Sequence, residues 1–376
     1  MEHEPIGLYL HIPFCESKCP YCDFFSMRAN EETLDAYTDA LCEKLRLLQE
    51  TAPNLSADTL YFGGGTPALL GAKRLCRLLD SAAPYLTENA EITLEANPGK
   101  PLFELFKAVA EKGVNRVSLG LQSASENELR FLGRTHSAAD AARAVSDAHK
   151  AGISNVSLDL MLALPGQTEA SLKTSVSFCR EAGASHVSAY LLQIEPHTRF
   201  WQMRGTLSLP DADEAADLYL FTCEALEESG FLQYEISNFA QENRQSRHNL
   251  KYWDLRPYLG LGPSAHSFFD GKRFFYPRSL RQFLSGAAPS PEEDPQCPAG
   301  SFFEYAMLRL RLCEGLTEAG CNARFGHGIP ELLRRRAARY APAGLLKRDE
   351  TTLSLTRLGF LVSNTLLEEL LEPFFL

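Results

Sequence analysis

Three cysteines lie close together at Cys15, Cys19 and Cys22, with the spacing C-x3-C-x2-C. Cysteine thiolates hold iron–sulfur clusters, and a cubane cluster has four irons to ligate. Three thiolates from one loop can therefore hold three irons and leave the fourth open to chelate and reduce a small molecule. Zinc is the alternative, but it needs a fourth nitrogen or sulfur ligand, and the nearest candidate is His11 in the preceding expected strand. The spacing favours a 4Fe-4S cluster.

The elements that position these cysteines alternate between short apolar runs and helical patterns. Helices are predicted between the strands, for example over Thr33–Gln49 and after the N-cap Thr168. A series of strand–helix units predicts a parallel sheet in which all connections between strands have the same handedness. The predicted fold class is α/β, a partial (β/α)6 barrel. Its six strands are expected at Leu8–Ile12, Thr59–Phe62, Ile92–Glu95, Arg116–Leu119, Asn155–Leu160 and His186–Leu191.

The strands have one apolar face and one polar face, because side chains alternate with a period of two. The polar face carries Glu95 and Asn97 in and after the third strand, Ser118 and Gln122 in and after the fourth, and Asp159 in the fifth. An ordinary barrel fills its interior with branched apolar residues. Here the apolar face is expected to meet the helices, which predicts a hollow, polar interior able to hold a polar cofactor.

Polar motifs also follow the strands, at the carboxyl ends where function concentrates in such folds. The cysteine loop follows the first strand, Gly63–Pro67 the second and Gly120–Ser123 the fourth. Glycine-rich turns let backbone groups approach a ligand. Carboxylates accept hydrogen bonds from an ammonium or a ribose, and Arg134 is suited to grip a carboxylate. A surface role for Arg134 at a helix start is equally compatible with the sequence alone.

Length and composition indicate a globular protein. The 376 residues are 45% hydrophobic, and the net charge of −11 argues against nucleic acid as the main partner. The N-terminus does not read as a signal peptide. No apolar run approaches the roughly 20 residues that span a bilayer, so an integral membrane protein is not expected. Seven of the ten cysteines are scattered singly, which fits free thiols in a reducing cytoplasm.

Four prolines among small and acidic residues predict a linker over 285–300. The barrel is predicted over 1–235, an extension over 236–284 and a small domain over 301–376. This domain is expected to be a winged-helix-like α+β module, because three helices, a hairpin around Asp349 and a further helix after Thr356 follow one another. Its run Arg334–Arg336 could contact phosphates, but a solvated helix face is favoured in an acidic chain. The helices are predicted at Phe302–Leu312, Thr317–Phe325 and Pro330–Tyr340.

With Tyr21 between the last two cysteines, the cysteine stretch resembles the signature of the radical S-adenosylmethionine (SAM) superfamily. Together with the other motifs, the chain resembles the oxygen-independent coproporphyrinogen oxidase group within it. The resemblance runs from about Gly7 to Leu370. It is carried by Tyr9–Phe24, Gly63–Pro67, Glu95–Pro98, Gly120–Ser123, Leu132–His136 and Asp159–Gln167.

Two branches exist in that group, and the chain is similar to the HemW branch of haem chaperones. The oxidase branch carries a further cysteine two positions after the third cluster cysteine and a longer N-terminal segment. Here that position is Phe24, and fourteen residues precede Cys15. The segments Tyr234–Phe239, Arg247–Trp253 and Tyr258–His266 also resemble the HemW branch.

The resemblance implies roles for individual residues. Cys15, Cys19 and Cys22 would ligate the 4Fe-4S cluster, with SAM on the fourth iron. His248, in the His-Asn-x-x-Tyr-Trp segment, matches the histidine associated with haem in this branch; a structural histidine is the alternative, and His266 is a second candidate. The matches to the family's SAM contacts are Tyr9, Gly64, Gly65, Thr66, Glu95, Gln122, Arg134 and Asp159.

Two positions depart from the family pattern. Ala163 and His197 stand where relatives often have glycine. Neither is a predicted ligand contact, so the departures concern local loop geometry.

Two functions follow from the resemblance. The first is a haem chaperone that holds haem, a cluster and SAM and delivers haem to acceptor proteins. The second is the radical decarboxylation of coproporphyrinogen III, so the resemblance leaves open whether the chain is an enzyme. Phe24 and the short N-terminus favour the chaperone. An electron donor such as flavodoxin or ferredoxin, and a homodimer, are compatible with either function.

Overall fold

The computed structural model describes residues 4–292 and 297–374. Its centre is a curved sheet in which six strands run parallel, each beside the next in the chain. Every predicted strand lies within one of them, which confirms the barrel fold. They are β1 (Ile6–Ile12), β2 (Ala57–Gly64), β3 (Leu86–Ala96), β4 (Arg116–Gln122), β5 (Asn155–Leu162) and β6 (His186–Leu191).

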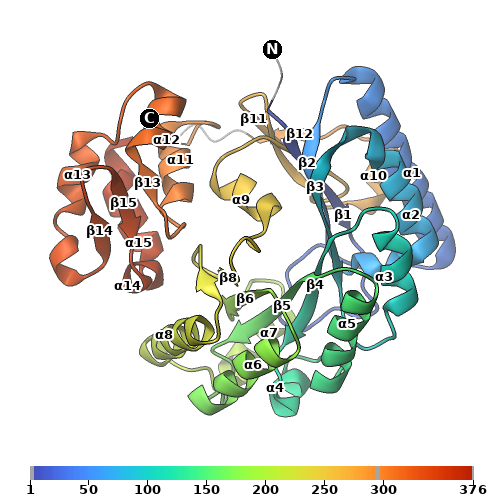
Figure 1. Ribbon diagram of the computed structural model, residues 1–376, viewed down its shortest axis with the longest axis horizontal. Coiled ribbons are helices and arrows are strands. Elements are labelled where there is room, and N and C mark those ends of the chain that lie inside the picture. The colour runs from blue at the N-terminus through green and yellow to red at the C-terminus, as the bar shows by residue number, and fades with distance from the viewer. Residues whose placement is uncertain (1–3, 293–296, 375–376) are drawn as a thin grey trace.

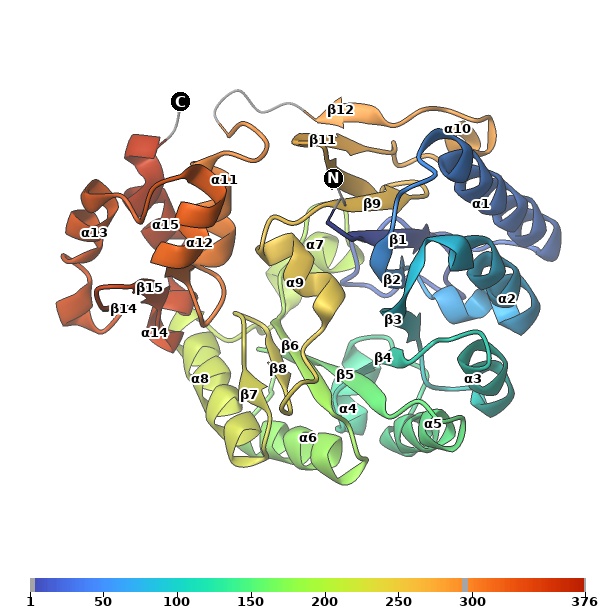
Figure 2. The ribbon, with the colours of Figure 1, turned by 45° about the horizontal axis from the view of Figure 1, so that its top comes forward.

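Helices cover the outer face of this sheet, and α9 (Arg247–Trp253) lies inside the arc (Figures 1 and 2). Thr168 caps α6 by accepting a hydrogen bond from a backbone amide of the first turn, as the sequence predicts, whereas α1 begins at Glu31, two residues before its predicted start, because Asn30 caps it. The outer helices are α1 (Glu31–Thr51), α2 (Gly71–Ala82), α3 (Phe103–Ala110), α5 (Ala138–Lys150), α6 (Glu169–Glu181) and α8 (Ala212–Glu228). Two short helices, α4 (Glu126–Phe131) and α7 (Arg199–Met203), complete this half.

The barrel is partial because β1 pairs with β9, not with β6. Later segments of the chain, most of them from the predicted extension 236–284, lengthen both edges of the sheet. The β1 edge gains β9 (Tyr258–Leu261), β10 (His266–Phe269), β11 (Lys272–Phe275) and β12 (Ser290–Glu292), and the β6 edge gains β8 (Asn238–Ala240) and β7 (Leu232–Gln233). The helix α10 (Leu280–Leu284) ends directly before the predicted linker 285–300, and β12 lies within that linker, of which 293–296 lie outside the described residues.

The C-terminal residues form a winged-helix-like domain, as predicted. Its antiparallel sheet has the order β13-β15-β14. It lies beside the side of the arc that the barrel sheet leaves open (Figure 1). Its elements are α11 (Phe302–Arg309), β13 (Leu316–Thr317), α12 (Glu318–Phe325), α13 (Glu331–Ala337), β14 (Leu346–Arg348), β15 (Thr352–Leu355), α14 (Arg357–Leu361) and α15 (Ser363–Leu371).

Two main apolar cores stabilise the molecule. The larger lies between the barrel sheet and its helices. The second belongs to the C-terminal domain but includes Leu255, Tyr258 and Phe268 from the edge of the barrel. The two parts therefore share packed surface. Among the described residues, no helix combines the length and the apolar character that crossing a bilayer requires.

Candidate functional site

A cavity of about 400 Å³ opens at the carboxyl ends of the parallel strands. Its wall is polar, as the alternation of side chains predicts: Glu95, Ser118, Gln122 and Asp159 all line it. The apolar residues of the same strands, such as Leu158, face the helices and are buried. The fold thus produces a hollow interior where most barrels have a packed one.

The cavity brings together ten of the twelve predicted site residues. Two predicted residues, Tyr9 and His248, lie behind the wall and do not line it. The ten lining residues are Cys15, Cys19, Cys22, Gly64, Gly65, Thr66, Glu95, Gln122, Arg134 and Asp159.

The three cysteines lie half-buried on the loop that follows β1. The loop is anchored by a hydrogen bond from the Cys15 amide to the Met27 carbonyl (3.0 Å), and its last turn closes through the Cys22 amide and the Cys19 carbonyl (3.2 Å). Within the described ranges, no three side chains of His, Cys, Asp or Glu converge on a single metal ion. A cubane cluster needs no such convergence, because each thiolate binds a different iron.

Arg134 connects the cysteine loop to the barrel. Its Nη1 donates to the Cys19 sulfur (3.4 Å), while Nη2 donates to Asn97 Oδ1 (2.6 Å) and to the Gly120 carbonyl (2.8 Å). These hydrogen bonds tie the cysteine loop to the carboxyl ends of β3 and β4. The surface role that the sequence left open for Arg134 is therefore not what the structure shows, since its guanidinium lines the cavity.

The glycine turn after β2 packs directly against the cysteine loop. Gly64 has φ +110°, and a Cβ there would lie 2.5 Å from the His11 ring. A Cβ on Gly65 would lie 2.6 Å from the Phe14 carbonyl oxygen. Both positions therefore require glycine. The turn holds the Gly64 amide 3.2 Å from Glu95 Oε2, and it places Thr66 Oγ1 3.6 Å from the Cys15 sulfur.

Two carboxyl groups inside the barrel have raised pKa values. Loss of hydration raises the pKa of Glu95 to about 7. The hydrogen bond from the Tyr61 hydroxyl lowers this pKa, and the charge of Asp159 raises it. Loss of hydration likewise raises the pKa of Asp159 to about 6, although Ser188 and Arg116 oppose it. A cationic or hydroxyl-bearing ligand would offset this cost by donating to both carboxylates.

Tyr9 and His11 support the cysteine loop from behind. His11 Nε2 donates to the Phe25 carbonyl (3.2 Å), so its Nδ1 accepts from the Tyr9 hydroxyl (3.0 Å). Burial lowers the pKa of His11 to about 4, which keeps this ring neutral. Both ring nitrogens of His11, the nearest candidate for a fourth zinc ligand, are thus engaged elsewhere.

His248 lies on α9 at the opposite end of the barrel interior and is buried. Its Nδ1 is 2.7 Å from the Thr59 hydroxyl and its Nε2 is 2.7 Å from the Tyr252 hydroxyl. The ring stacks on Tyr61 at 5.1 Å, and burial lowers its pKa to about 3. In this arrangement neither nitrogen is free to reach iron, so ligation by His248 requires the Tyr252 contact to open.

The second candidate, His266, lies at the start of β10 with 51% of its side chain exposed. Its Nδ1 is 3.0 Å from Glu292 Oε2 on β12. It does not line the cavity.

Several cavity residues were missed by the sequence analysis. Tyr61 and Ser188 lie on the polar faces of β2 and β6, where the same alternation could have found them. Asn249 comes from α9, far along the chain, and no local pattern indicates its position.

Arg116 is the most unusual of the missed residues. It is 2% exposed, and its Nε and Nη1 have no hydrogen-bond partner within the described part of the chain. Burial opposes its charge, but nearby Glu91 and Tyr61 keep its pKa above the ordinary value. Because Arg116 lines the cavity, these unpaired donors fit a polar ligand with acceptor groups.

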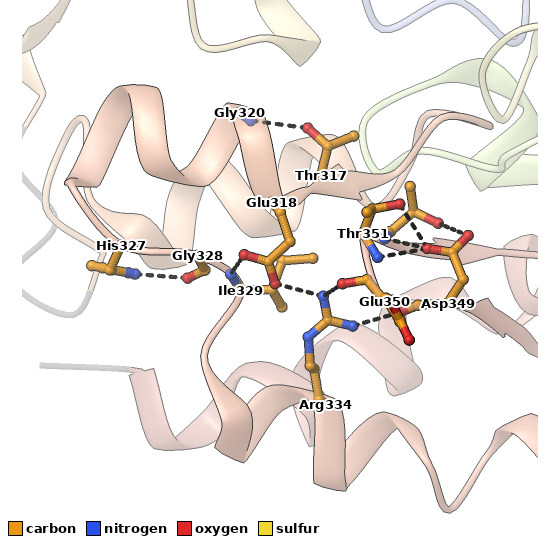
Figure 3. Close-up of polar contacts among 11 residues, drawn as sticks. Thr317, Glu318, Gly320, His327, Gly328, Ile329, Arg334, Asp349, Glu350 and Thr351 are labelled. Carbon is orange, nitrogen blue, oxygen red and sulfur yellow. Dashed lines mark hydrogen bonds and ion pairs between the residues drawn. The ribbon is translucent and has the colours of Figure 1, made fainter.

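The three arginines of the run Arg334–Arg336 all contact acceptor groups within the C-terminal domain. Arg334 contacts Glu318 Oε1 (2.6 Å) and the backbone carbonyls of Asp349 and Glu350 in the hairpin turn (Figure 3). Arg335 pairs with Glu331, and Arg336 pairs with Glu372. These contacts agree with a helix face that is neutralised within the domain.

Models of known protein families match segments in both halves of the chain. The model of the radical SAM superfamily matches residues 9–179, and the model of the HemN C-terminal domain matches residues 302–362. Among solved structures, coproporphyrinogen III oxidase (HemN) from Escherichia coli covers 98% of this chain and 91% of its own, with a TM-score of 0.83. At 20% identity, this likeness concerns the fold.

Curated relatives match nearly end to end. A protein of Lactococcus lactis named heme chaperone HemW is 34% identical over 99% of this chain and 98% of its own. Proteins of the same name from Escherichia coli and Synechocystis are 36% and 38% identical, and they cover 97% and 84% of this chain.

Proposed function

The chain belongs to the family of the heme chaperone HemW, within the radical SAM superfamily, and from this we propose that it binds haem and delivers it to acceptor proteins. The observation that carries the proposal is the near full-length identity of 33–36% with several proteins of that name. The likeness to the oxidase HemN, in contrast, is one of fold at 20% identity.

We infer that the cavity also holds a 4Fe-4S cluster and SAM. Cys15, Cys19 and Cys22 would ligate the cluster, and Arg134 would position Cys19 through its hydrogen bond to the sulfur. When bound, the cluster supplies an electron to a molecule chelated at its open iron. The donors and acceptors on the cavity wall, Glu95 and Asp159 among them, would bind the polar groups of SAM.

Phe24 supports the chaperone over the oxidase. It lines the cavity beside the cysteine loop and is 66% exposed. In the oxidase branch of the group that the chain resembles, in contrast to the HemW branch, a further cysteine occupies this position. A phenylalanine supplies neither a thiol nor a proton, so the chain lacks that group at the cavity mouth.

The partners and setting follow from the same proposal. Haem-accepting proteins are the expected partners, and an electron donor such as flavodoxin or ferredoxin and a homodimer stay predictions. Cys42, Cys76 and Cys179 form no disulfide in the structure, which fits a reducing, cytoplasmic setting.

The test uses the full chain after anaerobic reconstitution of its cluster. Haem is added, its absorption spectrum is recorded, and its transfer to an apo haem protein is followed. Stoichiometric binding and transfer are expected. In parallel, coproporphyrinogen III is incubated with the protein, SAM and a strong reductant, and the products are weighed by mass spectrometry. Loss of two carboxyl groups would make the protein an oxidase and refute the proposal.

A further inference from the structure

Arg116 is a buried cation that forms no ion pair within the described residues. It is the first residue of β4 and is 2% exposed, and its Nε and Nη1 find no acceptor in the described part of the chain. A buried charge is stable only where a counter-charge or hydrogen-bond acceptors compensate its lost hydration. Because Arg116 lines the cavity, a ligand is able to supply that compensation.

Three carboxyl groups act on the charge of Arg116 from a distance, yet each accepts hydrogen bonds from other donors. Glu91 accepts from the two backbone amides at the start of α9 (3.1 and 3.0 Å). Glu95 and Asp159 accept from hydroxyl groups of neighbouring strands (2.8 and 3.3 Å). The guanidinium donors of Arg116 therefore stay available to a group from outside the chain.

The Arg116 end of the cavity is distinct from the cysteine end. Gln122 ends the same strand at the rim that carries the cysteine loop, and this length of strand places the backbone of Arg116 roughly 20 Å from that rim. Thr93 lies beside Arg116 in register on β3, so both side chains face the same side of the sheet. Its buried hydroxyl also has no partner within the described ranges. A cation and unpaired donors at one place favour an anion.

The chemistry of the donors indicates the class of anion. A guanidinium is planar and carries five N–H donors, which suit the two oxygens of a carboxylate. Water also accepts hydrogen bonds, but it brings no charge and leaves the buried cation uncompensated. The cavity has a volume of about 400 Å³, so the space beside a ligand at the cysteine end is small. A carboxylate with few further atoms fits both the chemistry and the space.

We propose that Arg116 forms a binding subsite for a carboxylate at the end of the cavity opposite the cysteine loop. The carboxylate accepts hydrogen bonds from Nε and Nη1 and forms an ion pair with the guanidinium, and no covalent bond forms or breaks. It belongs either to a small free acid or to an arm of the ligand at the cysteine end. The subsite requires neither haem nor the cluster, so the inference goes beyond the proposed function and is tested independently of it.

The test is the binding of sodium acetate to the full-length protein without cofactors, read by saturation-transfer NMR at constant ionic strength. The wild type is expected to bind acetate, and Arg116→Met should weaken binding by about tenfold or more, because the ion pair and its hydrogen bonds are lost. Arg116→Lys keeps the charge without the planar donors and should weaken binding severalfold. Arg143→Met removes an exposed arginine of α5 and is the matched control, which should leave binding unchanged.

Arg134 also lines the cavity, and its variant separates the two ends. Loss of acetate binding in Arg134→Met but not in Arg116→Met would place the anion at the cysteine end and overturn the proposal. Absence of acetate binding in the wild type would overturn it as well. With the cluster reconstituted, displacement of acetate by SAM would show that the subsite takes the carboxylate of that ligand. Simultaneous binding of both would show that it takes a free acid.

A second measurement needs no variant and so does not depend on the folding of Arg116→Met. Wild-type crystals are soaked in sodium bromide, and anomalous diffraction locates the ion. A peak within hydrogen-bond distance of Arg116 Nε or Nη1 is expected, and its absence would contradict the proposal. A peak there, combined with unchanged acetate binding in a folded Arg116→Met variant, would mark an adventitious ion only.

Discussion

At the scale of single residues, replacing one of the three cysteines of the loop should remove a cluster ligand, whereas replacing one of the other seven should not. We predict that Cys19→Ser abolishes the cluster, because two thiolates and a hydroxyl cannot hold a cubane that needs three protein thiolates here. Iron and sulfide analysis after anaerobic reconstitution measures the loss. Cys42→Ser is the matched control, since Cys42 lies on α1 away from the cavity, and an unchanged iron content in Cys19→Ser would contradict the prediction.

Glu95 makes the site sensitive to pH. Because its pKa in the folded protein is about 7, it accepts a hydrogen bond from an ammonium group only when it is ionised. We predict that SAM binds about tenfold more tightly at pH 8 than at pH 6, as the ionised fraction rises over that range. Anaerobic calorimetric titration at pH 6, 7 and 8 measures the slope. Glu95→Gln should flatten it, whereas Glu104→Gln on the surface helix α3 should not.

The raised pKa of Glu95 also makes the stability of the folded protein depend on pH. Its value of about 7 lies above the value of 4.5 of an unperturbed glutamate, so the folded protein holds the Glu95 proton more tightly than the unfolded chain does. The stability that this contributes is fully present below about pH 4.5 and is lost as pH rises through about 7. Ligand-free Glu95→Gln should therefore gain stability relative to the wild type at pH 8 but not at pH 4.5.

At the scale of elements, caps determine where the helices behind the site begin. Thr168 accepts from the Ser171 amide, and the Ser171 side chain accepts from the Thr168 amide, which together form a capping box. We predict that Thr168→Ala lowers the free energy of unfolding by about 1 kcal/mol. Denaturant unfolding measures it. Thr174→Ala, in the same helix but away from the cap, should cost less than about 0.5 kcal/mol, and equal effects would argue against the cap.

Loop elements also explain the two departures from the family pattern. Ala163 has φ 59° and His197 has φ 68°, in the left-handed region that favours glycine. Relatives with glycine there need no strain to adopt this backbone. Both departures therefore raise the free energy of the loop conformation, and they leave the cavity residues in place.

At the scale of the whole molecule, ion pairs connect the barrel to the C-terminal domain. Glu304 of α11 is 5% exposed, and it pairs with Arg273 of β11 and accepts from the Gly300 amide (2.7 Å). We predict that Glu304→Ala destabilises the protein by about 3 kcal/mol, since it leaves a mostly buried guanidinium without its carboxylate. Glu331→Ala removes an exposed pair and should cost less than about 0.5 kcal/mol. Scanning calorimetry compares the two variants.

The charge of the molecule bears on its partners. With a net charge of −11 and the arginines of α13 paired internally, we predict that the full chain gives no mobility shift with short DNA duplexes at physiological salt. A clear shift would show that the winged-helix-like domain binds nucleic acid despite these pairs.

Much of this architecture was predictable because it depends on local patterns. The period of two in β3 to β5 placed Glu95, Gln122 and Asp159 on the inner face, and Thr168 marked the start of α6. The spacing of the cysteines indicated one loop with three thiolates. Each of these signals lies within a few residues of the group that it predicts, so the chain's own geometry carries it.

Other features depend on contacts between distant segments, and only the tertiary structure decided them. The strands from β7 to β12 are short and pair with edges formed far away, so their local pattern is weak. His248 meets its hydrogen-bond partner Thr59 across 189 positions. The readiness of a histidine to bind iron depends on which nitrogens are already engaged. For His248 the tertiary structure decides this, because it brings Thr59 to one ring nitrogen and Tyr252 to the other.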